Sequence, residues 1–317
     1  MTPLHGIHTI DTGFVRPQFD AAYLIVENGH GAFIDCGTNH AVPRMLAALA
    51  AAGITAAEVD WLILTHVHLD HAGGAGELIA QLPNAQLVVH PRGARHMIDP
   101  SVLWAGASAV YGEAVMEQTY GRLRPVPANR VIEAADDHVV DLAGRPLRCI
   151  DTPGHAKHHL TVFDARANVC FTGDVFGLSY REFDTANGPF ILPTTSPVQF
   201  DPDELHASID RLVTLRPDAM YLTHYNRVGN VGKLAADLHE QIDAMVALAR
   251  AADGRKDRHA ALADALTELY AGRAEAHGWT QGREALAQLL HMDIELNAQG
   301  LEVWLNRQRI QATSVLR

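Results

Sequence analysis

A short histidine-rich segment, "THVHLDHAGG" at residues 65–74, constrains this chain more than any other part of its sequence. Within six residues it holds three histidines and one aspartate, and it directly follows the apolar run 61–64. Such a cluster of ionisable side chains packs poorly in a core. It suits a metal ion, because imidazole and carboxylate groups bind zinc, iron and manganese. The segment therefore predicts a metal site.

The spacing of these side chains indicates how they divide between metal positions. On an extended segment, residues two apart project to the same side, so His66 and His68 can approach one ion. Asp70 and His71 follow where the chain begins to turn, and we expect them to face a neighbouring position. The glycine pair at 73–74 permits a tight turn and a close approach of the backbone to the metal.

Three further residues of metal-ligand type stand where later apolar strands end. His155 follows the strand "RCI", Asp174 follows "NVCF", and His224 follows "AMYL". Each is flanked by glycine or threonine. Strand ends that carry ligand types at four separate places are hard to attribute to chance, so we interpret them together as one metal centre.

Composition narrows the class of protein and its partners. The 317 residues are 48% hydrophobic and 20% charged, which is typical of a soluble globular protein with a substantial core. The net charge of −12 argues against a nucleic-acid partner, because a polyanion would be repelled. No apolar run approaches the roughly 18 residues of a membrane helix, so we expect no membrane partner. A small-molecule substrate is the expected partner.

The N-terminus and the cysteines indicate the compartment. The first residues have neither the basic start nor the apolar stretch of a secretory signal. The three cysteines are widely spaced and form no CxxC motif, which argues against a disulfide framework. We therefore expect a cytoplasmic protein.

The order of predicted elements indicates an α/β layered architecture. Asn28-Gly29 predicts a hairpin turn between two apolar runs, and strands then alternate with helices. The segments 92–129 and 177–200 break this rhythm, and they contain Trp104 and Tyr180 as candidate walls of a substrate pocket. From about residue 231 the sequence is mostly helical. We predict a catalytic domain at 1–230 and a helical C-terminal extension at 231–317.

The motifs "HVHLDH", "GHA", "GD" and a final histidine, in that order, resemble the metallo-β-lactamase superfamily, in its branch of glyoxalase II-like and lactonase-like hydrolases. The resemblance covers about residues 5–230 and includes the early strands that end at Asp35. It implies an αββα sandwich of the α+β class, with metals at one edge of two facing sheets.

The resemblance also implies a ligand set for two divalent ions, with zinc as the expected element and iron or manganese as alternatives. Three residues would hold the first ion, three the second, and one would bridge both: His66, His68 and His155; Asp70, His71 and His224; and Asp174. By the same resemblance His159 would support a ligand through a hydrogen bond. We expect the neighbouring His158 to face solvent.

A two-metal centre of this kind supports hydrolysis. Two ions that share a water lower its pKa from about 15.7 toward 7 and polarise the oxygen under attack. We expect Asp70 to orient the resulting hydroxide and carry its proton, and Tyr225 to bond the substrate's oxygen. The prediction is a binuclear hydrolase whose metal-bridging hydroxide cleaves a small ester, thioester or lactone.

Two alternative hypotheses belong to other classes. The first is an iron-dependent oxidoreductase similar to the persulfide dioxygenases, which use one iron in a similar site. The second is a regulatory protein that acts by binding a partner through its helical extension. The apolar stripe of that extension would equally serve a homodimer or cover the core.

Overall fold

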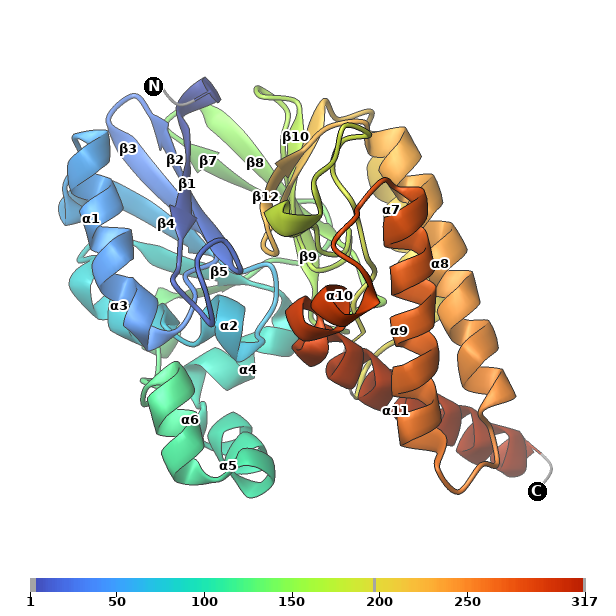
Figure 1. The fold of residues 1–317 in the computed structure, drawn as a ribbon. Helices are drawn as coiled ribbons and strands as arrows, with labels where there is room; N and C mark the ends of the chain where they lie inside the picture. The colour runs from blue at the N-terminus through green and yellow to red at the C-terminus, as the bar shows by residue number, and fades with distance from the viewer. Residues whose placement is uncertain (1–3, 196–197, 316–317) are drawn as a thin grey trace. The chain divides into compact units, whose positions relative to one another are not determined.

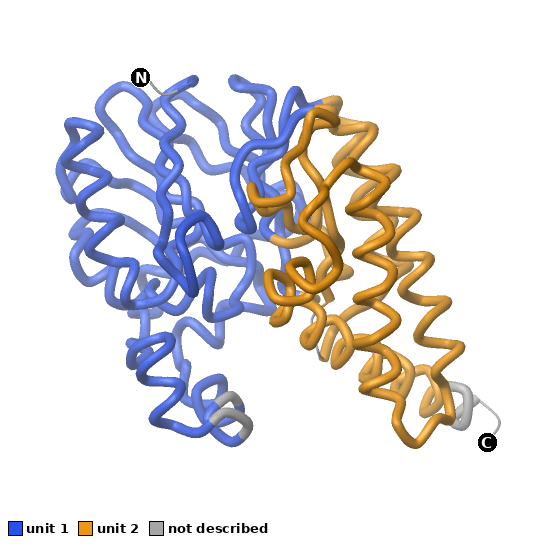
Figure 2. Tube along the Cα trace, viewed as in Figure 1, with its two compact units in different colours: residues 1–151, 158–173, 217–229 blue, residues 152–157, 174–216, 230–317 orange. Residues whose placement is uncertain are grey.

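The structure, a computed structural model, describes residues 4–195 and 198–315 (Figure 1). The chain forms two compact units, each assembled from separate stretches of sequence (Figure 2). The first unit comprises residues 1–151, 158–173 and 217–229. The second comprises residues 152–157, 174–216 and 230–317.

The first unit contains a sheet of six strands that follow one another in sequence order, β1 to β6. The first three strands are antiparallel neighbours, and β3 to β6 run parallel. The predicted hairpin is present, because Asn28 and Gly29 both adopt positive φ and join Glu27 to its partner His30. The strands are β1 (Ile7–Asp11), β2 (Ala21–Glu27), β3 (His30–Ile34), β4 (Val59–Ile63), β5 (Gln86–Val89) and β6 (Val131–Glu133).

A second sheet of six strands, ordered β12-β11-β10-β9-β8-β7, also belongs to the first unit. Its neighbours are antiparallel except for the parallel pair β10 and β11. The segment between that pair is long and contains a helix of the second unit. The strands are β7 (His138–Leu142), β8 (Arg145–Asp151), β9 (Leu160–Asp164), β10 (Val169–Gly173), β11 (Ala219–Leu222) and β12 (Asn226–Val228).

One apolar cluster joins the two sheets inside the first unit. Tyr23 and Ile34 from the first sheet pack with Val162 and Phe171 from the second. A separate cluster lies on the other face of the first sheet, where Met45 and Leu78 come from helices. Both faces of this sheet are therefore buried, which explains the nearly continuous apolar runs of its parallel strands.

The helices of the first unit fill the connections between strands. Helix α1 ends at Gly53, whose φ of 75° is the left-handed conformation that commonly terminates a helix. The segment 92–129, which breaks the predicted alternation of strands and helices, forms mainly α4, α5 and α6. The helices are α1 (Val42–Ala52), α2 (Leu69–Ala72), α3 (Ala75–Gln81), α4 (Pro91–Ile98), α5 (Ser101–Tyr111) and α6 (Glu113–Tyr120).

The second unit is mainly helical. Helix α7 has a capped N-terminus, since the Asp201 carboxylate accepts a hydrogen bond from the Glu204 amide at 3.2 Å and Pro202 opens the first turn. The predicted apolar stripe of α8 is buried from Leu234 to Ala249. The helices are α7 (Pro202–Thr214), α8 (Val231–Ala251), α9 (Arg258–Ala276), α10 (Arg283–Leu289) and α11 (His291–Val315).

The segment 174–216 belongs to the same compact unit as α8 to α11. The division into a catalytic domain at 1–230 and an extension at 231–317 stays a prediction. Among the described residues, no helix combines the length and the apolar character needed to cross a membrane.

Candidate metal centre

The histidine-rich segment leaves the end of β4 and is held by hydrogen bonds within the first unit. The Leu64 amide donates to the Val88 carbonyl at 2.9 Å, and the Leu160 amide donates to the Thr65 carbonyl at 2.7 Å. The backbone and hydroxyl of Thr65 both donate to the Asp35 carboxylate at 2.8 Å. These bonds tie the segment to strands of both sheets and thereby fix its backbone position.

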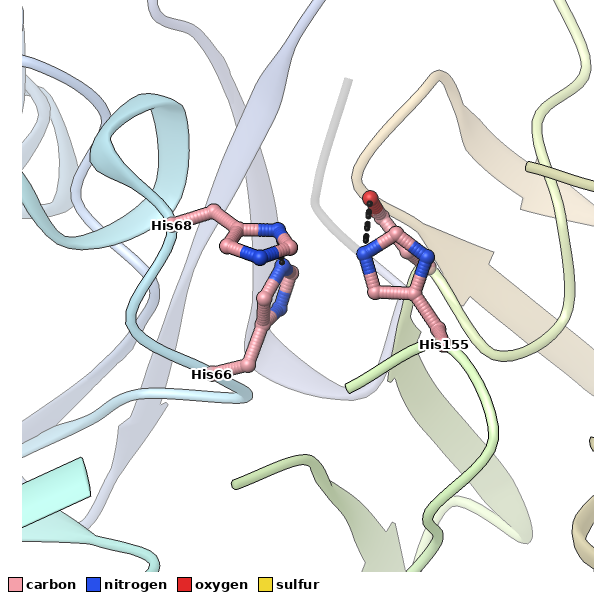
Figure 3. Close-up of side chains that lie close together, drawn as sticks. His66, His68 and His155 are labelled. Carbon is pink, nitrogen blue, oxygen red and sulfur yellow. Dashed lines mark hydrogen bonds and ion pairs between the residues drawn. The ribbon is translucent and has the colours of Figure 1, made fainter. Parts of the chain in front are cut away.

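His66 and His68 face each other, as expected for residues two apart (Figure 3). The Nε2 atom of His66 lies 2.8 Å from the Nδ1 atom of His68. Thr65 donates its one hydroxyl hydrogen to Asp35, so its oxygen accepts from the His66 Nδ1 atom at 3.2 Å. The lone pair of His66 therefore lies on Nε2 and is directed toward His68. Either a hydrogen bond between His66 Nε2 and His68 Nδ1, or a cation bound by both, gives each nitrogen an interaction partner.

Asp70, His71 and His224 form a second group inside the first unit. Their ligand atoms all lie within 4.8 Å of one another. The Asp70 Oδ2 atom is 3.7 Å from His71 Nε2 and 3.4 Å from His224 Nε2. Two ligands that each lie about 2.1 Å from a tetrahedral zinc ion are about 3.4 Å apart. The spacing of these atoms therefore fits a divalent ion between them.

The ring orientations of His71 and His224 support the same interpretation. The His71 Nδ1 atom donates to Asp35 Oδ2 at 3.0 Å, and the His224 Nδ1 atom donates to the Phe19 carbonyl at 2.9 Å. Neither acceptor can donate, so both hydrogens lie on Nδ1 and both lone pairs lie on Nε2. The two lone pairs are therefore on the nitrogens that face Asp70. Metal-binding histidines in proteins are commonly oriented in this way.

His155 and Asp174 form a pair inside the second unit. The His155 Nε2 atom lies 3.4 Å from Asp174 Oδ2, and its Nδ1 atom lies 3.3 Å from the Thr194 carbonyl. His155, labelled in Figure 3, thus repeats the arrangement of His224. Its position depends on Gly154, where an added Cβ would lie 2.4 Å from the backbone of Leu205. Only glycine allows this loop to approach α7 so closely.

The seven predicted ligands thus fall into three sets, each within one compact unit. The sets are His66 with His68; Asp70 with His71 and His224; and His155 with Asp174. The division of these sets between two ions, and the role of Asp174 as a bridge, stay predictions.

The two histidines that follow His155 are both buried. The prediction that His158 faces solvent is wrong, because this side chain is buried and its Nδ1 atom accepts from the Val67 amide at 3.5 Å. His159 is fully buried, and its ring centroid lies 5.0 Å from that of His66. An added Cβ at Gly173 would lie 2.7 Å from the His159 Nε2 atom, so glycine is needed there. These contacts are consistent with a supporting role for His159.

The aromatic candidates for substrate contact occupy different surroundings. Tyr225 is buried and belongs to the apolar cluster between the sheets. Tyr180 is buried in the second unit, where its hydroxyl donates to Asp293 Oδ1 at 3.1 Å. Trp104 lines a pocket of about 470 Å³ beside α5 and α6 of the first unit. Their roles toward a substrate stay predictions.

Two carboxylates beside the ligands were not predicted as site residues. Asp35, which directly follows β3, also accepts from the Thr223 hydroxyl at 3.2 Å, next to His224. Because Asp35 directly follows an apolar strand, as the predicted ligands do, the sequence pattern could have indicated it as a site residue. Asp20 is fully buried and accepts from the Thr12 hydroxyl at 2.8 Å. Burial raises the pKa of Asp20 to about 7, while the charges of His224 and His71 act to lower it. Nothing in the sequence near Asp20 indicates this position.

Comparison with known proteins agrees with the geometry. The chain is 29% identical over 227 residues to a metallo-beta-lactamase fold-containing protein of Sulfurisphaera tokodaii, covering 70% of this chain and 79% of the relative. It is 28% identical to a hydroxyacylglutathione hydrolase of Acidiphilium cryptum, covering 75% of this chain and 76% of the relative. A metallo-beta-lactamase family protein of Thermus thermophilus superposes with a TM-score of 0.67 at 21% identity, covering 96% and 94% of the two chains.

These matches confirm the predicted fold class, the α+β fold of the metallo-beta-lactamases. The hydrolases among the relatives, together with the histidine and aspartate groups, support a metal-dependent hydrolase. The profile of the metallo-beta-lactamase superfamily matches residues 15–224, about two thirds of the sequence, and the chain belongs to this superfamily.

Proposed function

We propose that this chain is a binuclear metallohydrolase that cleaves a small ester, thioester or lactone. Membership of the superfamily supports the metal-dependent part of this proposal. Among the three bond types we favour the thioester, because the relative from Acidiphilium cryptum is named for hydrolysis of a hydroxyacylglutathione. The substrate itself is part of the proposal.

The observation that carries the proposal is the arrangement of Asp70, His71 and His224. Two imidazole rings present Nε2 to one carboxylate oxygen at 3.7 and 3.4 Å, while each Nδ1 is held by an acceptor. A histidine placed only for packing does not need its second nitrogen to face a carboxylate. Such preorganisation lowers the cost of binding a metal, because the rings need not reorient.

The residues that would hold the ions are those expected from the sequence. His66, His68 and His155 would bind one ion, Asp70, His71 and His224 the other, and Asp174 both. When bound, two divalent ions lower the pKa of a shared water and stabilise the charge that develops on the substrate's oxygen. Zinc is the proposed element, since nitrogen and carboxylate ligands at these spacings suit it.

Asp70 would have a second task besides holding metal. Its Oδ2 atom faces His71 and His224, and its side chain keeps about a quarter of its surface exposed. As a carboxylate beside the ions, Asp70 would accept a hydrogen bond from the attacking water and pass the proton to the leaving group. Tyr225 is the proposed hydrogen-bond donor to the substrate's oxygen. We also propose a cytoplasmic location, which the three unbridged, buried cysteines support.

The test combines metal analysis with a substrate screen on untagged protein purified without chelators. We expect about two equivalents of zinc per chain by elemental mass spectrometry, and metal-dependent hydrolysis of acyl-thioesters above that of lactones and simple esters. One equivalent of iron with oxidation of a persulfide would replace the proposal by the dioxygenase hypothesis. Absence of tightly bound metal, with no hydrolysis after metal is added, would contradict it and favour a binding role.

A further inference from the structure

Two histidines of the second unit, neither of them a predicted ligand, meet on neighbouring helices. His206 lies on α7 and His239 on α8, and these helices pack against each other (Figure 1). The two Nδ1 atoms are 2.5 Å apart. Both side chains are partly exposed, at 25% and 27%.

The rings lie end to end, with the nitrogens directed at each other. Their centroids are 4.8 Å apart and their planes differ by 15°. The distance between the centroids is 2.3 Å longer than the 2.5 Å distance between the two Nδ1 atoms. This difference equals the sum of the two distances from each ring centroid to its own Nδ1 atom. Both Nδ1 atoms therefore lie close to the line that joins the centroids. Because a ring nitrogen carries its lone pair in the ring plane, the lone-pair directions of the two Nδ1 atoms converge.

The outer nitrogens are held by carboxylates in a reciprocal pattern. His206 Nε2 lies 3.3 Å from Asp243 Oδ1 on α8, and His239 Nε2 lies 3.1 Å from Asp210 Oδ1 on α7. The His239 contact is a hydrogen bond, and an ionised carboxylate only accepts, so the His239 Nε2 atom carries a hydrogen. The carboxylate beside the His206 Nε2 atom favours the same tautomer of that ring. A neutral imidazole with its hydrogen on Nε2 has its lone pair on Nδ1. Two lone pairs at this distance repel unless a proton or a metal ion lies between them.

We propose that His206 and His239 bind a divalent transition-metal ion, such as Zn²⁺, through their Nδ1 atoms and thereby fasten α7 to α8. Imidazole nitrogens suit zinc, copper and nickel. Asp210 and Asp243 would orient the rings, as carboxylates commonly do for metal-bound histidines. At a zinc–nitrogen distance of about 2.0–2.1 Å, tetrahedral coordination requires the two Nδ1 atoms to move apart by about 1 Å and the rings to tilt toward the ion. Partly exposed side chains can make this adjustment, and water would complete the coordination.

The position of the ion suggests what it would stabilise. Helix α7 contacts the loop that carries His155: the Asp201 amide donates to the Gly154 carbonyl at 2.8 Å, and the Ser208 hydroxyl donates to the Pro153 carbonyl at 2.6 Å. His206 lies between these two contact points in sequence. An ion that holds α7 against α8 would therefore stabilise the helix on which this loop rests. The site shares no residue with the proposed catalytic ligands and does not depend on the proposed function.

Zinc stoichiometry of the full-length, zinc-loaded protein tests the proposal. The protein is dialysed to equilibrium against zinc at graded free concentrations, and metal per chain is measured for wild type, His206→Asn and His239→Asn. His291→Asn, which removes an exposed histidine of α11 in the same unit, is the matched control. We expect wild type and control to bind about one equivalent more than either variant, while all four keep the tightly bound equivalents.

Thermal unfolding gives a second readout. Because the ion would bind only the folded pair of helices, added zinc should raise the melting temperature of wild type and His291→Asn more than that of His206→Asn or His239→Asn. Equal zinc content and equal melting shifts in all four proteins would overturn the proposal and assign the short contact to a shared proton. A variant with altered circular dichroism is replaced by the corresponding Gln variant.

Discussion

The Nδ1 atom of His71 donates a hydrogen bond to the Asp35 Oδ2 atom across 3.0 Å, and both side chains are almost completely buried. Asp35 also accepts from the backbone and hydroxyl of Thr65 and from the hydroxyl of Thr223. One carboxylate thus orients His71 directly and bonds the residues that precede His66 and His224. Its charge and its acceptor geometry together position ligands from two separate segments.

Asp35→Asn should weaken metal binding without changing the size of the side chain. In the variant, an amide nitrogen, which donates hydrogen bonds, would replace a carboxylate oxygen, which accepts them. The donors on His71 and Thr65 would then face another donor and would lose the hydrogen bonds that orient them. We expect metal affinity to fall about 10–100-fold and stability to fall by about 1–3 kcal/mol. Competition with a zinc chelator measures the first and urea unfolding the second. The control is Asp60→Asn, whose partner His30 is about half exposed; equal affinities in the two variants would refute the positioning role.

His224→Ala should remove about one equivalent of metal and most of the hydrolytic activity. The variant leaves the second ion with Asp70, His71 and the proposed bridging residue Asp174. Elemental mass spectrometry and initial rates provide the measurement, and His30→Ala, at a half-exposed position, serves as control. Retention of full metal content would show that His224 is not a ligand.

Tyr225→Phe separates a role in catalysis from a role in packing. The phenylalanine ring preserves the contacts of the cluster between the sheets and removes only the hydroxyl. If the hydroxyl bonds the substrate's oxygen, kcat/KM should fall about 3–10-fold, the equivalent of one hydrogen bond, with metal content unchanged. Tyr221→Phe, in the same cluster, is the comparison. Unchanged kinetics would leave Tyr225 with a packing role alone.

His259 should make the stability of the second unit depend on pH. Its ring lies between Glu295 and Glu302, with both nitrogens 3.0 Å from a carboxylate oxygen. The bond to Glu295, followed by that to Glu302, raises the pKa of His259 above its ordinary value of 6.5. The stabilisation is therefore complete below about pH 6.5 and is lost as the pH rises through the higher folded-state pKa.

His259→Gln should accordingly lower the melting temperature at pH 6 and have a smaller effect at pH 9. The side chain is 39% exposed, so solvent screening limits the effect to less than about 1 kcal/mol. Differential scanning calorimetry at both pH values measures it, with His138→Gln on β7 as control. A loss of stability that is the same at both pH values would argue against the ion pairs.

Arg145→Met should destabilise the first unit strongly. Arg145 is buried with Asp164, to which its Nε atom donates at 3.1 Å, and with Glu27. Methionine would leave the Asp164 charge buried without its partner, at a cost of about 3–5 kcal/mol. Urea unfolding of this variant is compared with Arg124→Met, which breaks the exposed pair with Glu77 and should cost no more than about 1 kcal/mol. Similar costs would mean that Asp164 finds another partner.

Much of the architecture followed from short-range patterns. The hairpin at Asn28-Gly29 and the start of α7 at Asp201 depend on residues within four positions of one another, where turn and capping chemistry operate. The closeness of His66 and His68 was also predictable, because residues two apart on an extended segment project to the same side.

Other features were decided only by tertiary structure. The acceptors that orient His71 and His224 lie 36 and 205 residues away in sequence, and the partner of His206 comes from a different helix. The burial of His158 and the placement of Tyr225 between the sheets likewise depend on which segments pack together. Sequence neighbours determine which way a side chain projects from its own element. The direction of a lone pair depends on the groups that distant segments bring to it, and those contacts exist only in the folded chain.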